Sequence, residues 1–500
     1  MSAFFVATQS ETFFSTAATS DAVAYAVSTG RARRLGPRLY TRTVVDAEED
    51  ICRRNWAAIA EGYFPHSIIS GRTAFLFKPS EDGLIFLTAS QSRDVRVPGL
   101  RIRAQQGPSL QERDMPFMGL PLFMSSRPRA FLDNLKPSRS CSGAVTRTLS
   151  RAELEEALED FGRYDVENLN RLRDQARGLA SSLDGERRFA TLDGLFGALL
   201  HTKDVSLTSR PAKARAADVP YDPRRIESFE QLASSLLASG LPGIRENPHS
   251  DVSVLAFYES YFSNYIEGAE FTVQEAREIV FEGFVTPERP KDAHDILGTY
   301  QLVSDPHERA GVPATADQLV VILGSQHGAM RRERPEVRPG RWKNRNNRVG
   351  EYEFVDHTLV EGTLREGFRI YASLPPGLAR AAFAMYLVSE IHPFADGNAC
   401  MARIVMNSEL SVAGEHRIIV TTHDRRVYLA VLRGLGLNTN IDSYIRVLTM
   451  LQRRTAEIDS SVLEVAQDAL TKASAYVDPD RDANPFGVHF DIATAKLPRR

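Results

Sequence analysis

A short polar loop between two apolar helical segments constrains this chain more than any other part of its sequence. The first segment has the apolar stripe of a buried helix, at Leu378, Ala381, Ala382, Met385, Val388 and Ile391. A second helical segment begins at Ala399 and is predicted to stop at Gly414. Residues 392–398, HPFADGN, therefore join the end of one core helix to the start of the next.

The residue types in this loop indicate a phosphate site. Asp396, Gly397 and Asn398 precede a helix, whose free N–H groups and positive dipole end attract anions. Arg403 lies about one turn further on and is expected to reach back over the same place. An acid beside an anion site indicates a bridging Mg²⁺, and His392 is suited to accept a proton near neutral pH. Each residue taken alone also fits a structural role as a helix cap, a turn or a core histidine.

Together these residues resemble the signature of the Fic family of nucleotide transferases, HxFx[D/E]GN followed by Gly, a basic residue, two arbitrary positions and Arg. The matching positions are His392, Phe394, Asp396, Gly397, Asn398 and Arg403. The resemblance covers residues 250–455. It implies an enzyme that transfers AMP from ATP to a Tyr, Thr or Ser hydroxyl of a protein.

The resemblance also implies a role for each residue. His392 would be the catalytic base, Asp396 would hold Mg²⁺, and Phe394 would anchor the loop in the core. The nucleotide-binding set would be Phe394, Gly397, Asn398, Ala399 and Arg403, with Arg403 directed to the γ-phosphate. Gly397 favours AMP transfer over the Fic-like phosphotransferases, which have Ala there.

Two further segments fit the family. SNYIEG resembles its inhibitory motif, which implies that Glu267, with Ser263 and Gly268, would pair with Arg403 and turn the nucleotide away. Residues 339–355 could form a flap hairpin that docks a protein substrate by strand addition.

The motif departs from the family at two positions. Ala399 replaces the second glycine and Cys400 replaces the basic residue, so one charge-assisted phosphate contact is missing. Arg341, Arg345 and Arg348 on the flap are candidates to compensate. The alternatives are another nucleotide-like donor or the loss of catalysis.

The N-terminal part suggests a different function. Residues 15–45 begin with a helical pattern that ends at Gly30, and continue as an arginine-rich hairpin about Gly36-Pro37. This is the outline of a winged helix and resembles the AbiEi family of antitoxin-like regulators. The implied DNA-binding residues are Arg31, Arg33, Arg34 and Arg38. The alternative functions are therefore a DNA-binding regulator with an inactive Fic module, or a solvated hairpin with no DNA role.

The expected fold is multidomain α+β, with a mainly helical Fic core and a β-hairpin flap. A winged-helix-like domain and a small α/β region would precede the core. The expected divisions are 1–75, winged-helix-like; 76–205, α/β antitoxin-like; 206–225, linker; 226–460, Fic domain with inhibitory helix; and 461–500, tail. Ser150 and Glu153 predict a capping box at a helix start.

The composition of the chain limits the class of protein it can be, but does not identify its function. Among 500 residues, 43% are hydrophobic and 25% charged, and the net charge of -3 gives no global field for nucleic acid. Three widely spaced cysteines predict neither a disulfide framework nor a zinc site. No apolar run is long enough for a membrane span and no signal peptide is recognised, so we expect a cytoplasmic protein without a membrane partner. A homodimer is left open.

Overall fold

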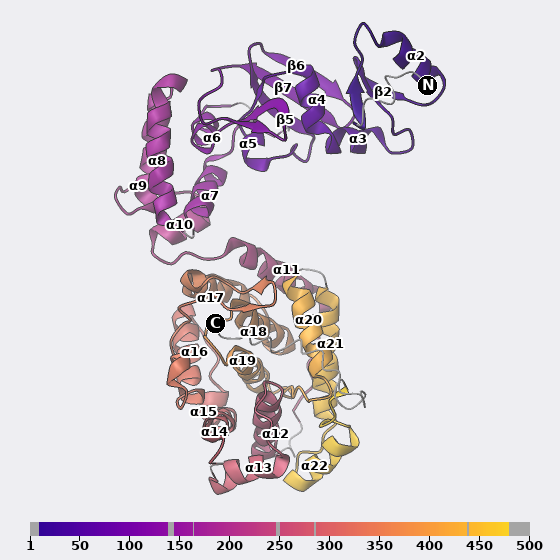
Figure 1. Ribbon diagram of the computed structural model, residues 1–500. Helices are drawn as coiled ribbons and strands as arrows, with labels where there is room; N and C mark the ends of the chain where they lie inside the picture. The colour runs from indigo at the N-terminus through magenta and orange to yellow at the C-terminus, as the bar shows by residue number, and fades with distance from the viewer. Residues whose placement is uncertain are drawn as a thin grey trace. The chain divides into compact units, whose positions relative to one another are not determined.

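The computed structural model consists of two compact units (Figure 1). Unit 1 is Met1–Ala217 and unit 2 is Asp218–Arg500. The structure describes residues 10–138, 145–163, 165–246, 251–284, 287–437 and 440–479. Unit 1 mixes sheets with helices and unit 2 is almost entirely helical, as the sequence predicts. Within the described ranges, no helix combines the length and the apolar character that a bilayer crossing requires.

Unit 1 begins with a small antiparallel sheet in the order β1-β3-β2. Its strands are β1 (Thr12–Phe14), β2 (Arg33–Gly36) and β3 (Leu39–Thr41). Helix α2 (Ser20–Ser28) packs on the sheet, since Val23 and Ala26 are buried against Phe13. The predicted helix and hairpin are therefore both present.

The arginines of this segment are partly engaged within the chain. Arg33 donates to the Asp46 carbonyl at 2.6 Å and lies 3.4 Å from Glu48. Arg31, Arg34 and Arg38 are exposed. A helix-turn-helix needs two helices, whereas α2 is the only helix among described residues 10–42. The winged helix and its DNA contacts stay predictions.

A six-stranded mixed sheet, in the order β6-β7-β5-β4-β9-β8, forms the centre of unit 1. Its strands are β4 (Ile68–Ile69), β5 (Leu84–Ala89), β6 (Arg93–Val97), β7 (Leu100–Gln106), β8 (Met115–Phe117) and β9 (Leu120–Met124). The helices around it are α3 (Glu48–Arg54), α4 (Trp56–Tyr63), α5 (Thr73–Leu76) and α6 (Arg127–Asn134). Leu35 and Leu39 belong to the same core as Ile85 and Ile102. The predicted division at residue 75 is therefore wrong, because one hydrophobic core crosses it.

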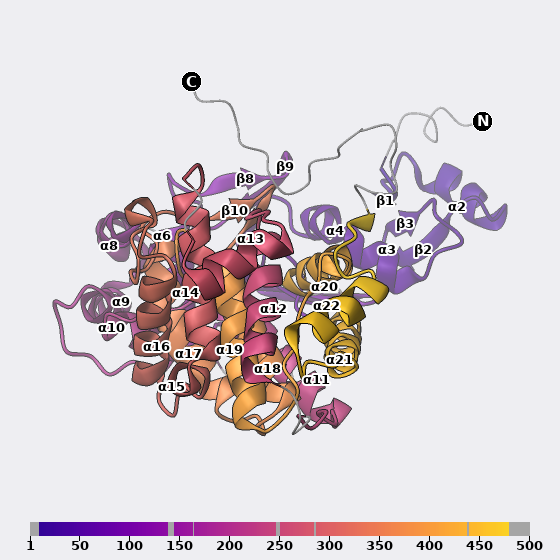
Figure 2. The ribbon, with the colours of Figure 1, turned by 90° about the horizontal axis from the view of Figure 1, so that it is seen from below.

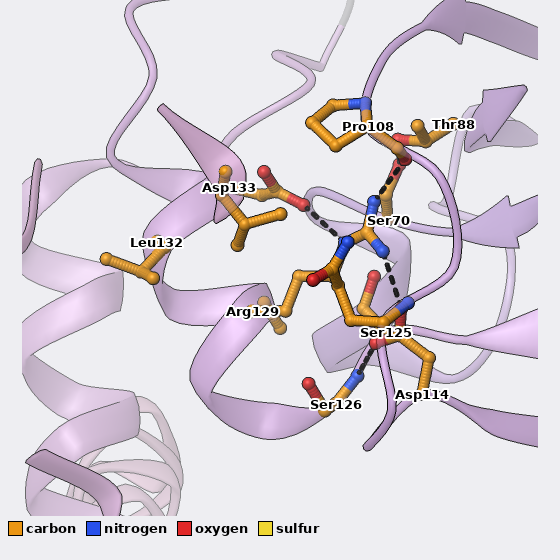
Figure 3. Close-up of polar contacts among 12 residues, drawn as sticks. Ser70, Thr88, Pro108, Asp114, Ser125, Ser126, Arg129, Leu132 and Asp133 are labelled. Atoms are coloured by element: carbon orange, nitrogen blue, oxygen red, sulfur yellow. Dashed lines mark hydrogen bonds and ion pairs between the residues drawn. The ribbon is translucent and has the colours of Figure 1, made fainter. Parts of the chain in front are cut away.

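A buried ion pair joins α6 to the segment before β8 (Figure 3). Arg129 has no exposed surface, and its guanidinium lies 2.5 Å from the Asp114 carboxylate and 3.5 Å from Asp133. It also donates to the carbonyls of Pro108 and Ser109 at 2.8 and 2.9 Å. These partners come from the chain itself, so we assign the cluster a structural role.

Replacing Arg129 with methionine is expected to destabilise unit 1 by about 3–5 kcal/mol, because it leaves Asp114 charged, buried and unpaired. Urea unfolding followed by Trp56 fluorescence, in a Trp342→Phe background, would report on unit 1 alone. Arg96→Met, at an exposed strand position, is the control. A loss no larger than that of the control would contradict a structural role for this ion pair.

The rest of unit 1 is helical, with α7 (Arg151–Gly162), α8 (Val166–Ala180), η1 (Ser181–Leu183), α9 (Glu186–Leu199) and α10 (Arg210–Ala216). The predicted capping box is confirmed at the start of α7, where Ser150 and Glu153 bond reciprocally. Leu207 and Ala212 lie in the core of these helices. The predicted linker 206–225 is therefore wrong in its first half, and the boundary between the units falls after Ala217.

Unit 2 is built around a helical hairpin of α18 (Leu378–Ile391) and α19 (Asn398–Val412), which pack against each other. Helices α12, α14 and α16 pack against α19, and Figure 2 shows α12 and α14 on either side of it. The helices before the hairpin are α11 (Pro223–Ser239), α12 (Val252–Tyr265), α13 (Val273–Arg277), η2 (Glu278–Glu282), α14 (Pro290–Ser304), α15 (Pro306–Arg309), α16 (Ala316–Met330), η3 (Pro335–Val337), η4 (His357–Leu359) and α17 (Val360–Tyr371). Those after it are α20 (Arg425–Gly436), α21 (Ile441–Ala456) and α22 (Leu463–Lys472).

Two further predictions concern unit 2. The predicted flap, 339–355, contains a short hairpin in which β10 (Arg348–Val349) pairs with β11 (Tyr352–Glu353). The predicted tail, 461–500, is wrong in its first part, since α22 buries Ala466 and Leu470 in the core with α12. Residues 480–500 of that tail lie outside the described residues.

Candidate active site

The loop from His392 to Gly397 is closed by the side chain of Asn398. Its Oδ1 accepts the Phe394 backbone N–H at 2.8 Å, and its Nδ2 donates to the Phe394 carbonyl at 2.9 Å. Both loop ends use left-handed backbone, with φ of 53° at His392 and 76° at Gly397. Phe394 has no exposed surface and so anchors the loop. The loop is thus held in one shape directly before the N-terminus of α19.

His392 is arranged as a neutral base. Its Nδ1 lies 3.0 Å from the Ser389 carbonyl, a group that only accepts, so Nδ1 carries the proton and the Nε2 lone pair is left available. The ring stacks on Phe354 of the flap segment, with centroids 3.8 Å apart. Burial lowers the pKa of His392 to about 4, so the imidazole is unprotonated at neutral pH.

A second histidine, His327 of α16, holds the loop from the other side. Its Nδ1 accepts the Gly340 N–H at 3.0 Å, so its Nε2 carries the proton and donates to the Asp396 carbonyl at 3.0 Å. Its ring stacks parallel on Phe394 at 3.7 Å. His327 has no exposed surface, and burial lowers its pKa to about 4. It therefore orients the loop in its neutral form and is a positioning residue.

Replacing His327 with alanine is expected to cost about 2–4 kcal/mol at neutral pH, since it leaves two part-buried backbone groups unpaired and removes the buried ring that stacks on Phe394. The unfolded chain binds the His327 proton near pH 6.5 and the folded chain only near 4, so acid weakens the parent protein through this residue. The difference between parent and variant should therefore shrink as the pH falls from 6.5 to 4.

Trp342 packs on Phe394 with centroids 5.1 Å apart, so its fluorescence in a Trp56→Phe background is the measurement for this variant. Chemical unfolding at several pH values gives the free energy of unfolding for each protein. A cost that is the same at every pH would contradict the role of the neutral imidazole.

The segment before the β10–β11 hairpin also contacts the loop. Lys343 is buried, and its backbone N–H donates to the Pro393 carbonyl at 2.8 Å while its Nζ donates to the Ile391 carbonyl at 3.2 Å. Asn347 Nδ2 donates to the Phe394 carbonyl at 3.0 Å. Burial lowers the pKa of Lys343 to about 8. The loop and the flap segment are therefore one connected structure.

Arg403 lies on α19 against the end of α12, where only 2% of it is exposed. Its Nε donates to the Ser263 hydroxyl and its Nη2 to the Ser263 carbonyl, both at 2.9 Å. Nη2 also lies 3.1 Å from Glu267 Oε1. Gly268 follows with φ of 102°, a value suited to glycine. The structure thus brings Ser263, Glu267 and Arg403 together, while the third guanidinium nitrogen, Nη1, is buried without a hydrogen bond.

The two departures from the motif lie at the start of α19. Cys400 is fully buried, with Sγ 3.5 Å from the Ser263 carbonyl and 3.6 Å from Arg403 Nη2, whereas Ala399 is partly exposed. Arg341, Arg345 and Arg348 are exposed, and no hydrogen bond or ion pair joins their side chains to the loop within the described residues. The flap arginines therefore do not occupy the place of the missing cation.

Asp396 is the loop's exposed carboxylate, with 55% of its side chain accessible. Its nearest cation is Arg331, whose Nε lies 3.6 Å from Oδ2. Among the residues the structure describes, no cluster of three or more His, Cys, Asp or Glu side chains could hold a metal ion. A divalent ion at Asp396 would therefore need phosphate oxygens and water for its remaining ligands, which is the usual arrangement for Mg²⁺ on a nucleotide.

Several residues of the site have no sequence signal. His327, Lys343 and Arg331 belong to no motif, and their contacts with the loop span 48 or more positions along the chain. His327 is the last of three consecutive polar residues, Ser325, Gln326 and His327, in a helix that is otherwise largely apolar.

Comparisons with known proteins agree with this geometry. The model of the Fic/DOC family matches residues 318–410, which include the loop and most of the helical hairpin. Among curated proteins, the chain is 25% identical over 283 residues to the protein adenylyltransferase Fic of Nematostella vectensis. That match covers 51% of this chain and 62% of the relative, so the chain spans less than two thirds of the curated relative's length.

Two solved structures are also similar. One is a Fic-domain-containing signalling protein from Bacteroides thetaiotaomicron, with 17% identity and a TM-score of 0.37, covering 49% of this chain and 97% of that one. The other is Fic-1 from C. elegans, with 16% identity and a TM-score of 0.34, covering 64% of this chain and 92% of that one. Residues 318–410 are the part of the chain that matches the Fic/DOC family model.

Proposed function

We propose that unit 2 transfers AMP from ATP to a Tyr, Thr or Ser hydroxyl of a protein, and that Glu267 restrains this activity. The observation that carries the proposal is the His392 imidazole, with Nδ1–H fixed on the Ser389 carbonyl and Nε2 available beside the N-terminus of a helix. The family match over the same loop and the adenylyltransferase relative support the choice of ATP as donor.

The proposed reaction uses few groups. The target hydroxyl oxygen attacks the α-phosphorus while its proton moves to His392 Nε2. The bond between the α-phosphorus and the oxygen of the leaving pyrophosphate breaks as the new P–O bond forms. The first N–H groups of α19 have no partner within the helix and would bind the α-phosphate. Gly397, which precedes these N–H groups, has no side chain, and the space that a Cβ would take is occupied by Arg331 and Met330.

A bound Mg²⁺ would supply charge neutralisation at the phosphates. Asp396 would be the protein ligand, in keeping with its exposed carboxylate. Chelation of divalent ions is expected to abolish transfer without unfolding the protein, since no buried described cluster depends on a metal.

We assign Arg403 to the γ-phosphate and Glu267 to its restraint. In the structure, Arg403 Nη2 is bonded to Glu267, so the carboxylate takes a donor that the phosphate would use. A protein substrate would add a strand to the β10–β11 hairpin, which lies on the segment that contacts the loop.

The test compares ATP labelled at the α-phosphate with ATP labelled at the γ-phosphate, using the Glu267→Gly chain. Label should enter protein from the first nucleotide and not from the second. Transfer of the γ-label would contradict the proposal and indicate phosphorylation. Nucleotide binding without any transfer would instead favour a nucleotide-sensing module whose catalysis has been lost through Ala399 and Cys400.

A further inference from the structure

The start of α19 lacks the cation of the family motif, yet a cation from another helix lies there. Cys400 stands where the motif has a basic residue, and its buried thiol contacts Ser263 and Arg403. Arg331, the residue that follows α16, lies beside Asp396 and Gly397, directly before this turn of α19.

The contact between Arg331 and Gly397 is tight. A Cβ added to Gly397 would lie 2.8 Å from Arg331 Nε and 3.4 Å from its Nη2. The guanidinium therefore lies directly over the glycine that precedes the free N–H groups of α19. Any other residue at position 397 would displace this arginine, in addition to adopting an unfavourable φ.

One end of the Arg331 guanidinium is held by an ion pair, and its Nε has no hydrogen bond in the structure. Only 5% of the residue is exposed, and Nη1 lies 2.6 Å from Oδ2 of buried Asp295. Nε is buried without a hydrogen bond, and its nearest charged group is the Asp396 carboxylate at 3.6 Å. The Asp295 carboxylate thus fixes one end of the guanidinium, and the opposite edge is directed to the loop.

We propose that Arg331 supplies the phosphate-binding cation that position 400 lacks, taking a phosphate oxygen of the nucleotide when Asp396 turns to the divalent ion. This inference rests on the proposed function and names a residue for it. A guanidinium is suited to the task, because it stays charged when buried and donates in a plane. Asp396 and Arg331 are paired in the structure, and a magnesium–phosphate pair would replace each partner with a group of the same sign of charge.

Arg334 provides a matched control. It bonds the same Asp295 oxygen through Nε at 2.6 Å and also bonds Asp292, but none of its described contacts reaches the loop. Replacing either arginine with glutamine removes one cation from Asp295. Only Arg331→Gln should remove a phosphate contact.

The experiment measures the affinity of ATP, with magnesium, and of adenosine by Trp342 fluorescence in a Trp56→Phe, Glu267→Gly background. Arg331→Gln should weaken ATP binding about 10- to 100-fold and leave adenosine binding unchanged, because adenosine carries no phosphate. Arg331→Lys should recover part of the loss, and Arg334→Gln should leave the ATP-to-adenosine ratio as in the parent.

The other possible results would contradict either the role of Arg331 or the proposed function. Equal losses for ATP and adenosine, or an unchanged ratio in Arg331→Gln, would overturn the role of Arg331 while leaving the proposed function in place. Failure of the parent to bind ATP at all would overturn the proposed function and this inference with it. Thermal unfolding of both glutamine variants shows whether each is folded at the assay temperature.

Discussion

Replacing His392 with alanine is expected to lower the rate of AMP transfer by about 10²- to 10⁴-fold, the usual contribution of a positioned general base. The fold should be retained, because the loop is closed by Asn398 and stacked on His327 rather than held by the His392 side chain. Single-turnover rates in the Glu267→Gly background give the comparison. His307→Ala, an exposed histidine on α15, is the control and should transfer at the parent rate.

The protonation of His392 should also determine how the rate of AMP transfer falls at acid pH. Because burial lowers the pKa of His392 to about 4, the base is already unprotonated at neutral pH. The value of kcat/KM should therefore stay level from neutral pH down to about pH 5 and fall only below it. An inflection near 6.5, the usual value for histidine, would contradict the buried neutral imidazole.

Replacing Glu267 with glycine is expected to raise transfer about 10- to 100-fold, which corresponds to the loss of one charge-assisted contact to Arg403. The pair is 3.1 Å long, and 35% of the Glu267 side chain is exposed, so water weakens it and the lower end of that range applies. The measurement is the initial rate of label incorporation from ATP labelled at the α-phosphate.

A second variant at position 267, with one control, distinguishes the effect of the Glu267 charge from the effect of its side-chain size. Glu267→Gln keeps the size of the side chain and removes its charge, so a rise similar to that of Glu267→Gly would assign the restraint to the ion pair. Glu282→Gln, an exposed position outside the site, should have no effect. Unchanged or lower transfer in both Glu267 variants would show that this carboxylate does not restrain the reaction.

Local signals in the sequence predicted the elements that carry the site. The apolar stripe before His392 and the glycine at 414 gave the helical hairpin within a residue or two of α18 and α19. The Ser150 capping box is likewise a local pattern, and it is confirmed. Such signals work because helix ends are decided by neighbours along the chain.

The features that the sequence did not predict depend on packing between residues that are far apart in the chain. The stretch 206–217 is rich in polar and small residues, yet Leu207 and Ala212 are buried by helices of unit 1, so it is not a linker. The sequence indicates flap arginines as the compensating cations, whereas the arginine that contacts the loop is Arg331, paired with Asp396 across 65 positions of the chain. The approach of Glu267 to Arg403 followed only from family resemblance, because no local rule relates residues so far apart.

AMP transfer that depends on His392 is tested by intact-protein mass spectrometry of the Glu267→Gly chain after incubation with magnesium and each of the four common nucleoside triphosphates. We expect a gain of one AMP with ATP on this chain or on a supplied protein substrate, and no gain when His392→Ala is added. A gain that persists without His392, or binding of ATP with no transfer to any protein of a complete lysate, would contradict this expectation.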